Sequence, residues 1–416
     1  MSALAQHLLR LGHVVSGSDR QENEQTAKLR KLGAAVTIGH SETAVHGAEL
    51  VVHTSAVQQD NCELAYAKAH GITTVLREEL LGAIFNAFDT RIAVCGTHGK
   101  TTATAMIHHV LERCGVSHAA FIGGEYNGEN YFFGSGIVVA EACEYNRSFL
   151  HLRPSICVCL NVEHDHPDCY PTQADTEQAF QLLFAQSEKT VIPKQYKALC
   201  KNAFVCGKDV FATNVTVNND GCAEFDVVCC GANVGRVALS VCGVHNVGNA
   251  IAAISAAHLL NLPMLQVLHA LRTFHGVDRR WSVKQGICTV VCDYAHHPTE
   301  IDAALATAKS VAKGKIICVF QPHTYSRTQA FFQRFADCFN GCDEVIYLPV
   351  YSAREKPIRR VTSYQLYKLA KTQGLHAKYC ADFTKAAQYI RRTAEPNDLV
   401  LLIGAGNVNT LADLLK

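Results

Sequence analysis

One stretch of this chain, residues 91–106, constrains its fold more than any other. Residues 92–95 form an apolar, β-branched run that predicts a buried strand, and the amphipathic run that starts at Lys100 predicts a helix. Between them, residues 96–102 read Gly-Thr-His-Gly-Lys-Thr-Thr. A strand, a glycine loop, a Lys-Thr pair and a helix are together typical of a phosphate-binding loop. In such a loop the backbone amides face phosphate oxygens, Lys100 adds positive charge, and the Thr101 hydroxyl can hold Mg²⁺.

An ordinary turn between a strand and a helix would also tolerate glycine. The full pattern is much rarer by chance, however, so we interpret it as a phosphate-binding loop. One departure from the usual pattern is that Val94, not glycine, stands five residues before Gly99. The loop is therefore predicted to be a shortened variant.

Length and charge limit the classes of function. At 416 residues the chain is longer than one core usually supports, so two or three domains are expected. The 38 basic and 37 acidic residues give no electrostatic reason to expect nucleic acid or a membrane surface as a partner. The chain also lacks a membrane-spanning apolar run and the features of a signal peptide. We expect a soluble, cytoplasmic protein.

The 19 cysteines suggest disulfides or zinc, but their spacing favours neither, because Cys-x-x-Cys does not occur. Many lie in apolar runs that predict strands, as in residues 156–160 and 317–320. We expect them to be small buried side chains in a reducing compartment.

The first 70 residues alternate between predicted helices and strands. Helices are expected at residues 2–11, 26–32 and 63–70, and strands at residues 12–16, 35–38 and 50–54. This alternation predicts a doubly wound parallel sheet, which ordinarily opens with a strand and a glycine-rich turn. The chain instead starts at a helix. Either the start is internal to a longer gene product, or this copy lacks its first strand.

Two further α/β segments are expected after the first. The second contains strands at residues 136–140 and 155–160, a helix at 175–188, a β-rich region at 190–241 and a helix at 246–260. The third contains strands at residues 287–292, 315–320, 344–348 and 399–403. We predict domains at residues 1–88, 89–276 and 277–416.

Two acidic stretches follow predicted strands, where an α/β sheet places its ligand residues. The first contains Glu141 and Glu144, and the second contains Glu163, Asp165 and His166. Mg²⁺ bound with a nucleotide requires hard oxygen ligands, for which Glu141 is suited, and His166 could take a second metal or a substrate oxygen. For Glu144, Glu163 and Asp165 a solvated loop position is an equal alternative. A zinc centre that also uses His164 is weaker, because adjacent residues rarely all reach one ion.

Other polar clusters leave alternatives open. Asn246 and Asn249 lie on one face of a predicted helix, where they could cap it or, with His245, contact a purine edge. Arg279 and Arg280 could clamp phosphate at a domain junction or lie in a solvated linker. The clusters at residues 293–300 and 321–328 follow consecutive strands, the usual place for a ligand crevice. Residues 404–407 resemble only half of a dinucleotide fingerprint.

Six of these motifs occur in the order found in the Mur ligases. They lie at residues 96–102, 161–166, 245–249, 276–280, 293–300 and 321–328. The resemblance covers nearly the whole chain. His98, the His-His-Pro-Thr-Glu run and the Pro-His-x-Tyr-x-Arg-Thr run are similar to those of the members that use L-alanine.

The resemblance implies an ATP-dependent ligase of peptidoglycan precursor synthesis with three α/β domains. A Rossmann-like N-terminal domain would bind the UDP sugar, a central phosphate-loop domain would bind ATP, and a Rossmann-like C-terminal domain would bring the amino acid. The lactyl carboxylate of UDP-N-acetylmuramate would take the γ-phosphoryl group of ATP. The amine of L-alanine would then attack the acyl phosphate.

The resemblance also implies roles for individual residues. Catalytic roles would fall to Lys100, His166, His297 and Arg327. ATP would contact Gly96, Thr97, His98, Gly99, Lys100, Thr101 and Thr102, with His245, Asn246 and Asn249 by the adenine, Arg280 by the phosphates and Asp293 by the ribose. Thr101 and Glu141 would hold one Mg²⁺, and His166 would bind a second. His296, His297 and Arg327 would face the acyl phosphate and the amino acid.

The amino end departs from the family pattern, which opens with a strand and a Gly-x-Gly-Gly-x-x-Met-Ser turn. Met1-Ser2 resembles the tail of that turn, and Ser16, Asp19 and Ser55 remain as candidate contacts to the UDP sugar. Two alternatives follow. One is a recycling ligase that joins a preformed peptide to the same UDP sugar, and the other is an inactive binding protein if the first strand is lost.

Overall fold

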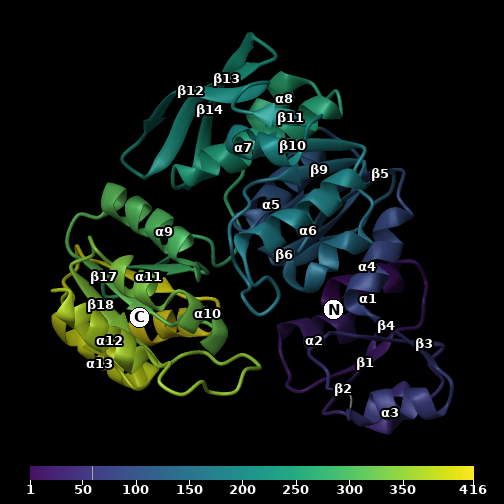
Figure 1. Ribbon diagram of the computed structural model, residues 1–416, viewed down its shortest axis with the longest axis horizontal. Coiled ribbons are helices and arrows are strands. Elements are labelled where there is room, and N and C mark those ends of the chain that lie inside the picture. Colours follow the sequence, from purple (N-terminus) through teal and green to yellow (C-terminus); the bar gives the residue numbers. More distant parts are fainter. Residues whose placement is uncertain (59) are drawn as a thin grey trace.

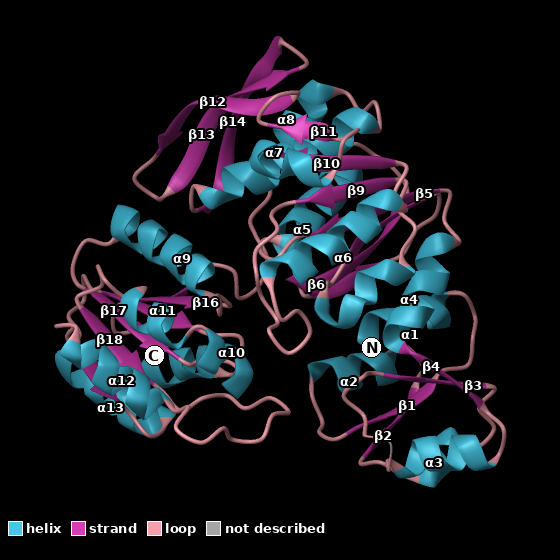
Figure 2. Ribbon diagram, in the orientation of Figure 1, coloured by secondary structure: helices cyan, strands magenta, loops and turns pink. Residues whose placement is uncertain are grey.

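The computed structural model describes residues 1–58 and 60–416 and consists of three α/β parts that follow one another along the chain (Figures 1 and 2). The amino-terminal part lies beside one end of the central part, and the carboxyl-terminal part lies across from both (Figure 1). The predicted α/β class is confirmed.

The amino-terminal part contains the first four strands. Its elements are α1 (Ser2–Arg10), β1 (Ser16–Asp19), α2 (Glu24–Lys31), β2 (Ala35–Ile38), η1 (Glu42–Val45), β3 (Leu50–His53), α3 (Cys62–Ala69), β4 (Thr73–Leu76) and α4 (Arg77–Asn86). The strands pair in parallel as β1 with β2 and β3 with β4, and these two sheets are separate. The single doubly wound sheet predicted here is therefore divided, because no described strand joins β1 to β3.

Two predicted bounds in this part are corrected. The strand expected at residues 12–16 begins only at Ser16, since Gly12, with φ of +88°, follows the end of α1 and Val14 is fully exposed. Helix α2 begins two residues earlier than expected, because the Asn23 side chain accepts a hydrogen bond from the backbone N–H of Thr26 and caps the helix.

The central part is built on a ten-stranded sheet with the order β14-β13-β12-β11-β10-β9-β5-β8-β6-β7. Its elements are β5 (Thr90–Cys95), α5 (Lys100–Arg113), β6 (His118–Tyr126), β7 (Glu129–Phe132), β8 (Ile137–Glu141), η2 (Tyr145–His151), β9 (Ile156–Cys159), α6 (Gln173–Ala185), β10 (Lys189–Pro193), η3 (Lys194–Leu199), β11 (Phe204–Cys206), β12 (Val210–Val217), β13 (Cys222–Cys229), β14 (Ala232–Cys242), α7 (His245–Leu259) and α8 (Met264–Arg272). The predicted β-rich region thus resolves into strands β10 to β14, of which β12 to β14 run antiparallel.

Strand β5 lies at the centre of this sheet, and its residues 92–95 are fully buried. Each buried valine or isoleucine side chain contributes about 1.5–3 kcal/mol through the hydrophobic effect. Strand β5 pairs in parallel with β8 on one side and β9 on the other, with Val94 opposite both Glu141 and Val158. The loops that follow these three strands therefore meet at one edge of the sheet.

The carboxyl-terminal part has a six-stranded sheet with the order β15-β16-β20-β17-β18-β19, in which only β15 is antiparallel. Its elements are β15 (Ser282–Gln285), β16 (Thr289–Asp293), α9 (Pro298–Val311), β17 (Ile316–Phe320), α10 (Tyr325–Ala330), α11 (Phe332–Asp337), β18 (Glu344–Tyr347), α12 (Ser363–Thr372), β19 (Ala377–Tyr379), α13 (Phe383–Thr393), β20 (Leu399–Ile403) and η4 (Val408–Leu415). Asp293 and Phe320 both lie opposite Ile403, so the two predicted polar clusters leave the same edge of this sheet.

All 19 cysteines are free thiols, as expected, and many of them, such as Cys157 and Cys318, lie fully buried in strands. Within the described ranges, no helix has the length and apolar character needed to cross a membrane.

Candidate active site

Two glycines give the loop between β5 and α5 its shape. Gly96 and Gly99 have φ angles of +139° and +82°, which residues with a side chain rarely adopt. A Cβ on Gly99 would lie 2.6 Å from Oδ1 of Asn249, at the start of α7. Both backbone conformation and space therefore require glycine at residue 99.

The loop that follows β9 holds the loop that follows β5. The backbone N–H of His98 donates to Oδ1 of Asn161 at 2.7 Å, and Nδ2 of Asn161 donates back to the His98 carbonyl at 3.0 Å. The Thr97 hydroxyl donates to the Glu163 carbonyl at 3.0 Å and accepts from the Glu163 N–H at 2.9 Å. Thr97 and Asn161 thus fix the loop by side-chain contacts.

Lys100, the first residue of α5, is largely buried and its charge is paired. Its Nζ donates to the Gly96 carbonyl at 2.6 Å and lies 2.9 Å from Oε2 of Glu144. Burial alone would lower the pKa of Lys100, but the Glu144 carboxylate outweighs it and raises that pKa. Lys100 is therefore fully protonated at the carboxyl edge of β5.

Thr101 and Glu141 place two hard oxygen donors side by side. The Thr101 hydroxyl donates to Oε2 of Glu141 at 2.8 Å, and the Gly123 N–H donates to the same oxygen at 3.1 Å. A hydroxyl and a carboxylate beside a phosphate-binding loop match the ligands that Mg²⁺ takes in nucleotide sites. These two residues fit a magnesium ion.

His166 lies at the same edge, with its Nε2 3.6 Å from Oε1 of Glu144 and 3.7 Å from Oδ2 of Asp165. Burial lowers the pKa of His166, although both carboxylates oppose this change. A neutral imidazole is the form that binds metals. The solvated-loop alternative is wrong for Glu144, which is 2% exposed and pairs with Lys100.

Asp165 joins the central part to the carboxyl-terminal part. Its two oxygens accept from Nε and Nη2 of Arg327 at 3.0 and 3.1 Å, and both side chains are less than a tenth exposed. Burial raises the pKa of Asp165, but Arg327 outweighs it and holds the pKa well below its usual range. Arg327, expected to face the acyl phosphate, thus forms a bidentate ion pair between two parts of the chain.

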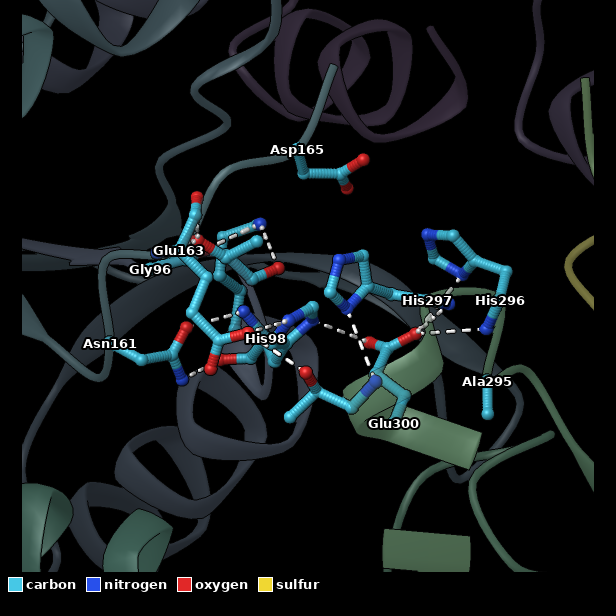
Figure 3. A network of polar contacts seen from close by, with 12 residues as sticks. Gly96, His98, Asn161, Glu163, Asp165, Ala295, His296, His297 and Glu300 are labelled. Carbon is cyan, nitrogen blue, oxygen red and sulfur yellow. Dashed lines mark hydrogen bonds and ion pairs between the residues drawn. The ribbon is translucent and has the colours of Figure 1, made fainter. Parts of the chain in front are cut away.

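The side chain of His98 also points across the boundary between the central and carboxyl-terminal parts, which we call the junction (Figure 3). Its Nδ1 lies 3.2 Å from Oε1 of Glu300, and its Nε2 lies 3.4 Å from Oε2 of Glu163. Burial lowers the pKa of His98, but the two carboxylates outweigh it and raise that pKa to about 9. The Thr299 hydroxyl adds a hydrogen bond of 2.9 Å to Oε2 of Glu163.

His297 caps helix α9 and is 1% exposed. Its Nδ1 accepts from the Thr299 N–H at 3.3 Å, and its ring lies 4.6 Å from the His98 ring (Figure 3). Burial, with His98 as the next cause, lowers the pKa of His297 to about 4. Its described contacts are those of a helix cap beside the junction.

A cavity of about 500 Å³ lies between the three parts. Its walls come from the phosphate-binding loop, the strand ends and both flanking parts of the chain, namely Gln25, Thr97, Gly99, Lys100, Thr101, Gly123, Gly124, Glu125, Asn130, Glu141, Cys143, Glu144, Asp165, His166, Asp278, Arg279, Arg280, Tyr294, His296 and Glu300. Most of the residues predicted to bind phosphate and metal therefore meet around one space. Arg280 extends along it, 4.9 Å from the centre of the Tyr294 ring and 3.8 Å from Glu300.

The predicted adenine residues lie at the start of α7. Asn246 is the second residue of this helix, so the N-cap alternative for it is wrong; its Nδ2 donates to the Cys242 carbonyl at 2.7 Å. Asn249 donates to Oδ1 of Asn246 at 2.9 Å, and His245 is exposed. Only Asn249 approaches the phosphate-binding loop directly, at Gly99.

Other candidates have structural partners. Asp293 accepts hydrogen bonds from the N–H groups of Trp281 and Ala295 at 3.0 and 2.8 Å. Arg279 donates to the carbonyls of Gly404 and Gly406, which accounts for the partial fingerprint at residues 404–407 as a packing contact. Ser16, Asp19 and Ser55 lie on β1 and after β3, and none of the three is among the described residues that line the cavity.

The sequence placed Glu300 in the polar cluster at residues 293–300 but gave it no role, and the structure brings it into contact with His98, His296 and His297 (Figure 3). Its Oε2 accepts from the N–H groups of His296 and His297, and Oε1 faces His98. The available pattern was the capping box, in which glutamate stands three residues after the cap and proline follows the cap. That pattern predicts the helix end but not the contact with the phosphate-binding loop.

Comparison with known proteins follows the same three parts. The family models that match are described as "Mur ligase family, catalytic domain" at residues 1–89, "Mur ligase middle domain" at residues 94–257 and "Mur ligase, glutamate ligase domain" at residues 279–406. The chain is 39% identical to the UDP-N-acetylmuramate–L-alanine ligase of Caldanaerobacter subterraneus subsp. tengcongensis over 98% of this chain and 93% of the relative. It is 35% identical to that of Clostridium perfringens, over 100% and 94% of the two chains.

Solved structures of Mur ligases have the same fold as this chain. The crystal structure of UDP-N-acetylmuramate–alanine ligase from Thermotoga maritima matches with a TM-score of 0.85 and 29% identity, over 99% of this chain and 95% of that one. A murein peptide ligase from Psychrobacter arcticus matches with a TM-score of 0.73 and 22% identity, over 100% and 95% of the two chains, which shows a shared fold.

Proposed function

The chain belongs to the Mur ligase family, and we propose that it is the ATP-dependent ligase that joins L-alanine to the lactyl carboxylate of UDP-N-acetylmuramate. The observation that carries this proposal is a cavity whose walls come from all three parts of the chain. A reaction with three substrates needs such a meeting point. The similarity to L-alanine ligases over the full length supports the choice of amino acid.

The reaction has two steps. A lactyl carboxylate oxygen attacks the γ-phosphorus of ATP, an O–P bond forms, the bond to the β-phosphate oxygen breaks and ADP leaves. The amine nitrogen of L-alanine then attacks the acyl carbon, a C–N bond forms, the C–O bond to phosphate breaks and inorganic phosphate leaves. The amine gives up a proton in this second step.

The phosphate-binding loop would hold the nucleotide. Its amides would bind the phosphates, and Lys100 would turn its ammonium from Glu144 toward the γ-phosphate as negative charge moves onto the transferred group. Arg280 would provide a second cation from the carboxyl-terminal side of the cavity. Phosphoryl transfer depends mainly on such positioning and charge neutralisation.

Thr101 and Glu141 would hold one Mg²⁺ and His166 a second, consistent with the oxygen pair and the neutral imidazole at this edge of the sheet. Magnesium bound there would neutralise the phosphate oxygens. We assign these cations from the donor set of the chain.

His296 would accept a hydrogen bond from the amine of L-alanine, and the departing phosphate would take the proton, because a histidine with so low a pKa is a weak base. Burial lowers the pKa of His296 to about 3, so its ring is neutral at neutral pH. Because Nδ1 lies 3.0 Å from the Tyr294 carbonyl, which only accepts, the ring proton is on Nδ1 and Nε2 is a free base. His296 lines the cavity, whereas Arg327 and His297 act through the junction.

We further propose that residues 1–88 bind the UDP sugar, 89–276 bind ATP and 277–416 bind L-alanine, in the cytoplasm, where nucleotide precursors are made. Gln25 supports the first assignment, because it lines the cavity from the amino-terminal side and donates to Oε1 of Glu125 at 2.7 Å. The assignment of Ser16, Asp19 and Ser55 to the UDP sugar remains a prediction.

A phosphate-release assay tests the function. Phosphate release from ATP is expected only when UDP-N-acetylmuramate and L-alanine are both present, with UDP-N-acetylmuramoyl-L-alanine as the product by mass spectrometry. A preformed peptide added in place of L-alanine should give no turnover. Turnover with the peptide alone would favour the recycling reaction, and ATP hydrolysis without either co-substrate, or none at all, would contradict the ligase.

A further inference from the structure

A cluster of two adjacent cysteines and one histidine lies in the central part, outside the candidate active site. Cys229 is the last residue of β13, Cys230 stands in the turn that leads to β14, and His258 lies in the last turn of α7. Asn249, the fifth residue of the same helix, lies beside the phosphate-binding loop. The cluster and the cavity therefore lie at opposite ends of α7.

The side chains converge on one another. Sγ of Cys229 lies 3.4 Å from Nδ1 of His258, and Sγ of Cys230 lies 3.6 Å from Nε2 of the same ring. One ring nitrogen and the two sulfurs all lie within 4.8 Å of one another. In tetrahedral zinc sites, with Zn–S of about 2.3 Å and Zn–N of about 2.0–2.1 Å, a sulfur and a nitrogen ligand stand about 3.5 Å apart. Each sulfur of the cluster lies at about this distance from a ring nitrogen, but the two sulfurs face different nitrogens, so an ion bound at one nitrogen must draw the second sulfur toward it.

The surrounding structure holds the three residues in place while leaving a way in. The Cys230 N–H donates to the Asp209 carbonyl at 2.7 Å, and the Phe204 ring lies 5.5 Å from the His258 ring in a stacked arrangement. Cys229 is 5% exposed, whereas Cys230 is exposed. An ion can thus enter from solvent at Cys230 and reach a buried sulfur behind it.

We propose that Cys229, Cys230 and His258 form a binding site for a thiophilic divalent cation such as Zn²⁺, with a fourth position open to water. Two thiolates and one imidazole are the ligand types that select zinc over magnesium. The bound ion fastens the β13–β14 turn to the end of α7. The adjacent cysteines lack the spacing of the common zinc motifs, so the sequence interpretation set zinc aside.

The chemistry of the thiols makes binding depend on pH. Burial, followed by the neighbouring Cys230, raises the pKa of the Cys229 thiol to about 11. The thiol is therefore protonated when no metal is bound, and coordination must release its proton.

A second pair of cysteines offers a matched control. Cys222 and Cys242 lie at the other end of the same two strands with their sulfurs 3.7 Å apart, and no hydrogen bond joins either of these sulfurs to a described histidine. The pair shares the strands, the thiols and their closeness, but not the imidazole. Cys242→Ser thus removes a thiol without touching the proposed site.

The test is a titration of the full chain with Co²⁺ in reducing buffer, followed by absorption spectroscopy. Wild type and Cys242→Ser should bind one equivalent with a sulfur-to-cobalt charge-transfer band that Zn²⁺ abolishes by displacement. Cys230→Ser and His258→Gln should weaken this binding at least tenfold or lose the band. The oxygen and imidazole donors at the phosphate-binding loop give no such band, so the proposed function does not affect the result.

Thermal unfolding provides the second measurement, because it does not depend on catalysis. Added Zn²⁺ should raise the Tm of wild type and Cys242→Ser and leave the Tm of Cys230→Ser and His258→Gln unchanged, since a ligand that binds only the folded state stabilises it. The proposal is overturned if no charge-transfer band forms, if the band persists in both site variants, or if Cys229 and Cys230 form a disulfide instead of binding metal.

Discussion

Lys100 is the residue on which the proposed phosphoryl transfer most depends. The structure gives it a partner before any nucleotide binds, because Glu144 lies 2.9 Å from its ammonium. The pair fixes a long side chain whose ordering would otherwise cost conformational entropy. It also means that the nucleotide must compete with a carboxylate for this charge.

Lys100→Ala should lower the rate of phosphoryl transfer by a factor on the order of 10²–10³ or more, because a charge that acts in the transition state is lost. Single-turnover phosphate release measures this rate. Lys201→Ala removes an exposed lysine of the same part and should leave the rate unchanged.

The single variant also leaves Glu144 buried without its partner, which can destabilise the fold. The double variant Lys100→Met with Glu144→Gln removes that charge and should fold while remaining equally slow. Normal turnover in either folded variant would remove Lys100 from the site.

Residues whose roles depend on local sequence could be predicted, and residues whose roles depend on distant contacts could not. The loop at residues 96–102 is predictable because a strand, a glycine turn and a helix are consecutive. The side-chain directions of His98 and Arg327 were not predictable, since Glu300 and Asp165 are remote in sequence. The phosphate and acyl-phosphate contacts expected of these two residues remain predictions that no contact described here tests.

At the scale of elements, the phosphate-binding loop depends on how closely α7 approaches it. Gly99 and Asn249 leave no room for a Cβ between the loop and the helix. Parallel neighbours of β5 then bring Glu141 and the loop after β9 to the same edge. The shape of the phosphate-binding loop thus depends on the packing between β5, α5 and α7.

Gly99→Ala should destabilise the chain by about 1 kcal/mol or more and weaken ATP binding, because alanine disfavours a φ of +82° and its Cβ would meet Asn249. Gly248→Ala is the matched control: this glycine is exposed in the interior of α7 with nothing within 4 Å of a Cβ. That variant should gain about 0.5–1 kcal/mol. Chemical denaturation and ATP titration measure both effects, and equal behaviour of the two variants would contradict the packing argument.

Helices and strands were predicted well where the apolar periodicity was clear, as in β2, β20 and α5. They were predicted poorly where a strand forms only because a neighbouring strand pairs with it. The strand placed at residues 12–16 was wrong because an apolar run does not show which residues find a partner. The sequence also did not predict that the first sheet is divided in two. Alternation of helices and strands predicts parallel strands, but not whether all of them pair in one sheet. Strands β4, β6, β7, β15 and β19 were missed altogether.

At the scale of the whole molecule, a few ion pairs and hydrogen bonds hold the carboxyl-terminal part against the central part. They join Asp165 with Arg327, Glu163 with Thr299, and His98 with Glu300. All three start from the two loops that form the nucleotide site. The position of the carboxyl-terminal part is therefore set from the same loops that would hold the nucleotide.

Arg327→Ala should leave ATP binding unchanged but impair ligation, because Asp165 would remain buried and unpaired at the junction, a change that costs about 3–5 kcal/mol. ATP titration and product formation measure the two effects separately. Arg334→Ala, at an exposed arginine of the same part, is the control. Unchanged ligation in Arg327→Ala would mean that ligation does not depend on the Asp165–Arg327 pair.

The junction should also weaken at high pH. Since the pKa of His98 rises from 6.5 to about 9 on folding, its stabilising contribution is complete below pH 6.5 and is lost as the pH passes through about 9. The difference in unfolding free energy between wild type and His98→Asn should therefore shrink over this range, from a value on the order of 3 kcal/mol. His151→Asn, an exposed histidine of the central part, should show no such trend, and a gap that is constant with pH would contradict the ion pairs.

The shared walls of the cavity have a consequence for fidelity. A mixed anhydride of phosphate and carboxylate is readily attacked by water, so the cavity must exclude water between the two chemical steps. Because the walls of the cavity come from three parts of the chain, loosening the contacts between these parts should let the acyl phosphate react with water before phosphoryl transfer stops. Such a molecule would consume ATP without making an amide, and the ratio of phosphate released to product formed would rise above unity.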